Sequence, residues 1–95
     1  MDRRTLYLLA CLAEECAEVQ QAVMKAIRFG LKDGYPGTGR TNRGDINIES
    51  HHILALIEML RAENILPPED RIITETKTRR TDEYYQYSRI SNSKE

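Results

Sequence analysis

Four residues of this 95-residue chain, all of types whose side chains can bind divalent cations, form two pairs with the same spacing. Glu15 and Glu18 are three residues apart, and so are Glu49 and His52. Because residues three apart lie on one face of a helix, each pair presents two ligands on the same side. Two such pairs on facing helices surround one point with three carboxylates and an imidazole, an arrangement suited to a divalent metal ion.

Each of these residues also has an ordinary structural interpretation. Most Glu pairs on helices, such as Glu15 and Glu18, belong to a solvated acidic surface. Glu49 is less easily explained in this way, because it falls within the apolar stripe of its helix, where a charge must be neutralised, ion-paired or bound to a metal. The ordinary role for His52 is a core-edge histidine bonded to a backbone carbonyl or a Glu. His51 points about 100° away from it, toward solvent, and is not a ligand candidate.

Helical periodicity predicts the elements that position these residues. Apolar residues recur at steps of three and four from Thr5 to about Leu31, which predicts a long first helix. A second helix is predicted to begin between Asn42 and Asp45 and to end near Glu63. A weaker third helix is predicted over Pro68–Ser88, followed by a frayed tail at about 89–95.

Length and composition favour a single all-α domain over residues 1–95. With 40% hydrophobic residues, one Phe and no Trp, the chain can fold but cannot bury a large core. We therefore expect a three-helix chain with antiparallel long helices that completes a four-helix bundle by oligomerisation, as a homodimer or homotetramer.

The charge balance and the apolar runs disfavour two classes of partner. Fourteen basic residues against fifteen acidic ones leave a net charge of −1, so no overall basic field favours nucleic-acid binding. No apolar run approaches the roughly 18 residues of a membrane span, and the N-terminus lacks the pattern of a signal peptide. A cytoplasmic protein without a membrane partner is expected.

At the acidic pairs the sequence resembles the MazG-like all-α nucleoside triphosphate pyrophosphohydrolases, in the short single-domain form common in phages and bacteria. That family carries Glu-Glu-x-x-Glu on one helix and Glu-x-x-Asp on the next. Here the first motif is Glu14-Glu15-x-x-Glu18, and the segment 53–60 sets the frame of the second, with Glu49 at the family's Glu and His52 at its Asp. The resemblance covers nearly the whole chain.

The resemblance implies hydrolysis of a (deoxy)nucleoside triphosphate to the monophosphate and pyrophosphate, with Mg²⁺ as cofactor and, for a phage protein, in the host cytoplasm. It implies that Glu15, Glu18 and Glu49 are catalytic metal ligands, that His52 is the fourth ligand, and that Glu14 orients water or a ligand. A histidine in place of Asp removes one negative charge and favours softer ions such as Mn²⁺, so activity would be altered or lost.

Three further residues are candidates for binding the substrate. Lys25 and Arg28 lie on later turns of the first helix and can meet phosphates, although cations near a helix C-terminus are favourable in any protein. Asn42 belongs to the loop segment that resembles the family and is the third candidate.

Two other functions remain open at this point. Glu-x-x-Glu with Glu-x-x-His is also typical of di-iron carboxylate bundles, which normally need two Glu-x-x-His motifs, so this chain would supply them only as a symmetric dimer. The second alternative is a non-catalytic helical oligomeric module with a degenerate site.

Overall fold

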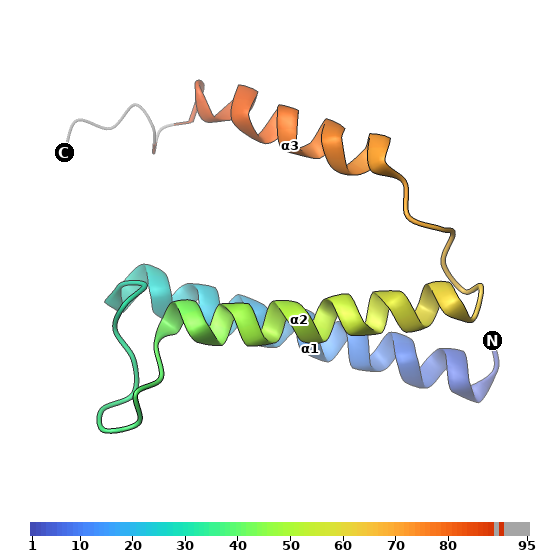
Figure 1. Cartoon of the computed structure of the whole chain (residues 1–95), viewed down its shortest axis with the longest axis horizontal. Helices are drawn as coiled ribbons and strands as arrows, with labels where there is room; N and C mark the ends of the chain where they lie inside the picture. The colour runs from blue at the N-terminus through green and yellow to red at the C-terminus, as the bar shows by residue number, and fades with distance from the viewer. Residues whose placement is uncertain (89, 91–95) are drawn as a thin grey trace.

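In a computed structural model of the chain, residues 1–88 and 90 are described, and within them there are three α-helices and no strand (Figure 1). The helices are α1 (Arg3–Phe29), α2 (Asn42–Ala62) and α3 (Arg71–Tyr85). The predicted all-α class is confirmed. None of the described helices is long and apolar enough to cross a membrane. The tail predicted to fray lies, apart from residue 90, outside the described residues.

Each helix begins at a side chain that accepts a hydrogen bond from a backbone amide of the first turn. The capping residues are Asp2, Thr41 and Asp70, with distances of 2.7, 3.1 and 2.9 Å to the amide nitrogens. These are residue types that favour the position before a helix. The third helix was predicted from Pro68, and it starts later because Asp70 caps it.

Only the first two helices pack against each other. α1 and α2 lie side by side over most of their length, whereas α3 stands apart from both (Figure 1). The buried apolar side chains of the described residues are few, namely Leu8, Ala22, Ala26 and Leu60. The core is therefore a single narrow seam between two helices.

Polar contacts fasten this seam at both ends. Near the start of α1, the Arg4 guanidinium donates to both carboxylate oxygens of Glu63, with its shortest contact at 2.9 Å. At the other end, the Asn42 side chain donates to the Gly30 carbonyl at 2.9 Å, and the Asn42 amide donates to the Asp33 carbonyl at 2.7 Å. These contacts fix how far α1 and α2 can slide past each other.

The loop between α1 and α2 closes tightly at Gly34. A Cβ atom at this position would overlap the backbone carbonyl of Arg40, so the two limbs of the loop meet where only glycine fits. Gly37 at the loop tip differs, because its φ of +77° favours glycine but no atom lies within 4 Å of its missing Cβ.

Replacing these two glycines by alanine tests the close approach. We expect Gly37→Ala to lower the free energy of unfolding by about 1 kcal/mol, since a left-handed backbone costs an L-residue that much. Gly34→Ala must also push two backbone segments apart and should cost clearly more. Urea unfolding followed by circular dichroism measures both, and equal losses would show that the loop limbs do not meet at Gly34.

Candidate metal centre

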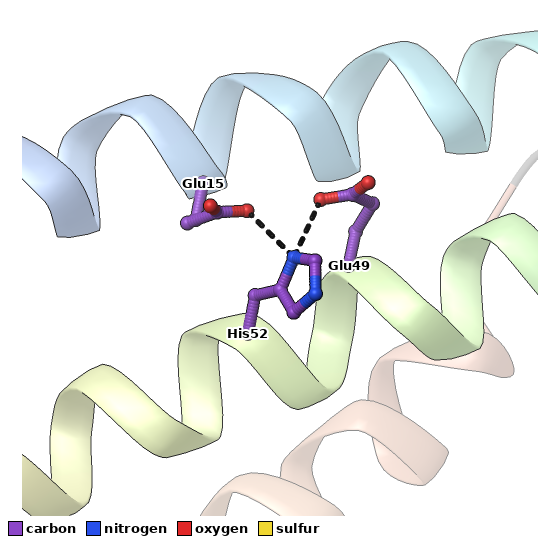
Figure 2. A group of neighbouring side chains, drawn as sticks. All are labelled: Glu15, Glu49 and His52. Carbon is purple, nitrogen blue, oxygen red and sulfur yellow. Dashed lines mark hydrogen bonds and ion pairs between the residues drawn. The ribbon is translucent and has the colours of Figure 1, made fainter.

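Three of the four predicted ligands meet on one side of the seam between the two long helices. Glu15 projects from α1, while Glu49 and His52 project from consecutive turns of α2 (Figure 2). The Nδ1 atom of His52 lies 3.3 Å from Oε2 of Glu15 and 3.3 Å from Oε2 of Glu49. The two carboxylates are largely covered, with 23% and 22% of their side-chain surface exposed, and the imidazole is half exposed.

The charge state of His52 follows from these contacts. Burial lowers the pKa of the imidazole, but the hydrogen bonds and negative charges of Glu15 and Glu49 outweigh it, so the pKa lies above the ordinary value of 6.5. A protonated His52 is the cation that compensates the two carboxylates when no other cation is present.

Glu18 adjoins this group from the next turn of α1. Its side chain is exposed, and it is not one of the three residues whose ligand atoms converge. The Glu49 carboxylate, through a hydrogen bond and like-charge repulsion, raises the pKa of Glu18 above its ordinary 4.5. Both carboxylates line one shallow cavity, so a cation there would relieve their repulsion.

The converging side chains fit a divalent cation. Ligand atoms of Glu15, Glu49 and His52 lie within 4.8 Å of one another. Two ligands that each lie about 2.0–2.6 Å from an ion are at most about 5 Å apart, so the donors can share one ion without movement of the helices. Two carboxylates suit Mg²⁺ or Mn²⁺, and the imidazole shifts the preference toward Mn²⁺, Fe²⁺ or Zn²⁺.

The remaining predicted residues divide between the site and its surroundings. Lys25 lines the same cavity as Glu18 and Glu49. Arg28 lines a different groove of α1, and its guanidinium carbon lies 5.3 Å from the centre of the Phe29 ring. Glu14 is exposed on α1 and is not among the converging ligands.

Asn42 has a structural task in this fold. Its side chain is buried, with 6% of the residue exposed, and it is bonded to the Gly30 carbonyl. It therefore joins the two ends of the loop, and contact with a substrate stays a prediction. His51 bonds to the backbone carbonyl of Asn47 at 2.7 Å and takes no part in the cluster.

Two more charged residues line the cavity, and one of them, Asp45, was missed at the sequence level. Arg40 and Asp45 form an ion pair of 2.9 Å and line the cavity together with Lys25 and Glu49. Asp45 precedes Glu49 by four residues, a helical spacing that signals a shared face. The fold of the loop brings Arg40 to the cavity.

No family model, curated protein or solved structure matches this chain. The resemblance to the pyrophosphohydrolases therefore rests on the motif residues of the sequence.

The raised pKa of His52 predicts how the stability of the metal-free protein depends on pH. The folded state binds the His52 proton more tightly than the unfolded state does, so this proton stabilises the fold. The stabilisation is complete below pH 6.5 and is lost as the pH rises through the raised pKa. In the presence of a chelator, we expect the melting temperature to fall as the pH rises from 6.5 through the raised pKa of His52.

Two single variants separate this effect from other titrations. His52→Gln should flatten the fall in melting temperature, whereas His51→Gln, next to it but outside the cluster, should leave it unchanged. A histidine NMR titration of His51→Gln gives the His52 pKa directly, and a value at or below 6.5 would contradict the pairing.

Proposed function

We propose that this protein is a metal-dependent nucleoside triphosphate pyrophosphohydrolase. The observation that carries the proposal is the convergence of Glu15 on α1 with Glu49 and His52 on α2, at ligand separations that suit one divalent cation. Glu18 adds a third carboxylate whose charge is disfavoured without a cation. In the sequence these same residues form the two motifs that resemble the family.

The charge of a nucleoside triphosphate and its metal ion would explain why acidic and basic residues line the same cavity. When bound, a divalent ion neutralises the triphosphate and lowers the pKa of water. Beyond the carboxylates, Lys25 and Arg40 line the same cavity and supply positive charge for phosphate oxygens farther from the ion. Water breaks the link between the α- and β-phosphates, which yields the monophosphate, pyrophosphate and one proton.

Roles for the individual side chains follow from their positions. Glu15, Glu49 and His52 hold the ion, and Glu18 completes the ligand set when the cation relieves its repulsion with Glu49. The role of Glu14, which is exposed beside this set, comes from the resemblance to the family, and it would orient water or a ligand.

The functional unit in this proposal is an oligomer. The chain exposes 8359 Å², whereas a folded monomer of 11.0 kDa exposes about 5,600 Å². The excess is far larger than the roughly 800 Å² that each partner buries in a standard interface. The antiparallel long helices of two copies would cover this surface as a four-helix bundle.

α3 gives a second, independent reason to propose a partner copy. It has 15 residues and four threonines, and it makes no packing contact with α1 or α2. Isolated helices of this length are marginal in water, so packing must stabilise it. Its exposed Ile72 and Ile73 are suited to that contact.

The decisive experiment is an assay of pyrophosphate release from the eight common (d)NTPs with Mg²⁺ or Mn²⁺. Glu49→Gln keeps the shape of the side chain but removes a ligand charge, and we expect it to lower kcat/KM by at least about 100-fold. Glu58→Gln is the matched control, since Glu58 is exposed on α2 and outside the cluster.

One further variant tests the histidine at the position of the family's Asp. His52→Asp should raise the Mg²⁺-dependent rate relative to the Mn²⁺-dependent rate, because it supplies a harder ligand and one more negative charge. Absence of pyrophosphate release from every nucleotide with either metal would overturn the proposed activity.

Sedimentation velocity tests the proposed assembly. We expect a mass of at least two chains at micromolar concentration, and a shift toward monomer for the double variant Ile72→Asp/Ile73→Asp. The double variant Thr74→Asp/Thr78→Asp adds the same two negative charges elsewhere on α3 as a control. A well-folded monomer in the unmodified protein would contradict the interpretation of the exposed surface.

A further inference from the structure

The cavity that holds Glu18 and Glu49 does not end at its basic residues. A second cavity of about 460 Å³ begins where the first stops, and the two share Lys25, Arg40 and Asp45 in their walls. Together they form one groove that runs along the end of α1 to the loop at residues 30–41.

The far end of this groove is aromatic. Phe29, the last residue of α1, and Tyr35, in the loop, both line the second cavity. The two residues are 60% and 77% exposed, so each has surface free to contact a ligand. Phe29 has the Arg28 guanidinium near its ring, and a base can add to such a stack.

Hydrogen bonds within the loop hold Tyr35 in place. Its carbonyl accepts hydrogen bonds from the Thr38 hydroxyl at 2.7 Å and the Thr38 amide at 3.3 Å, which closes a turn. The close approach of Gly34 to Arg40 fixes the residue before it. The tyrosine is therefore carried by a defined turn beside the groove.

The order of chemical groups along the groove matches the order of groups in a nucleotide. Glu18 and Glu49 line the first cavity alone, and Lys25, Arg40 and Asp45 line both cavities. Phe29 and Tyr35 line the second cavity alone, together with Asp33. A nucleoside triphosphate has a metal-binding phosphate chain at one end and a flat ring at the other. The volume of the second cavity falls within the range of small-molecule sites.

We propose that Phe29 and Tyr35 form the site for the base of the nucleotide. This inference rests on the proposed function, because it assigns the ring of the substrate whose phosphates the acidic cluster would hold. Stacking on an aromatic side chain tolerates any base, since every base has a π-face. The two aromatic side chains thus bind the base and align the triphosphate with the carboxylates.

Calorimetric titration in the presence of Mn²⁺ tests the assignment with two probes. The α,β-methylene analogues of dATP and dCTP carry both a base and a triphosphate that resists hydrolysis, whereas inorganic tripolyphosphate has no base. We expect Tyr35→Ala to weaken binding of the tighter analogue by about 5-fold or more, the usual effect of losing one stacking partner. Binding of tripolyphosphate should stay within two-fold of the unmodified protein.

Two variants control for indirect effects. Tyr35→Phe keeps the ring and should bind the analogue almost normally. Tyr87→Ala removes an equally exposed tyrosine that lines neither cavity and should change nothing.

The outcomes separate the two proposals. If Tyr35→Ala weakens both probes equally, or neither, the base site is overturned while metal-dependent phosphate binding stands. If neither probe binds the unmodified protein with Mn²⁺, the proposed function and the base site fail together.

Discussion

Two carboxylates from different helices lie 3.3 Å from one imidazole nitrogen, and this contact constrains how α1 and α2 pack. A step of one residue along a helix moves a side chain by 1.5 Å and turns it by about 100°. A slip of that size would separate Glu15 from His52 and would leave the largely covered Glu15 carboxylate without the imidazole that compensates its charge. The packing of the two long helices and the charge balance of the site therefore depend on each other.

Contacts at the two ends of the seam fix the register of α1 against α2, although few apolar side chains are buried between these helices. Few apolar side chains of the described residues are buried, so hydrophobic packing alone specifies the register weakly. The Arg4–Glu63 pair at one end and the buried Asn42 amide at the other supply directional contacts. The Asn42 contact also sets the ends of the loop that carries Arg40 and Tyr35, which links the geometry of the candidate metal centre to that of the adjoining groove.

Much of the site was predictable because it depends on helical periodicity. The i,i+3 spacing of Glu49 and His52 and the position of Glu49 on an apolar stripe together indicate that both face the neighbouring helix, and the structure places Glu15 opposite them. The loop was not predictable, because Arg40 and Tyr35 reach the groove through turns that depend on a backbone approach at Gly34. The structural role of Asn42 was not predictable either, since the sequence does not distinguish a buried amide side chain from an exposed one. α3 makes no packing contact with α1 or α2, and the order of apolar and polar residues within α3 does not show whether it will pack against them.

A histidine at position 52 gives the metal-free cluster a different charge balance from the one that an aspartate would give. With Asp there, Glu15, Glu18 and Glu49 would share their small volume with a fourth negative charge, and the metal-free fold would be destabilised by repulsion. Protonated His52 supplies a positive charge from within the chain, which the raised pKa reflects. An incoming cation must then displace a proton as well as bind, so affinity for a hard ion falls as the stability of the metal-free protein rises. A site of this kind would stay folded without a metal and would bind most readily an ion for which imidazole is itself a good ligand.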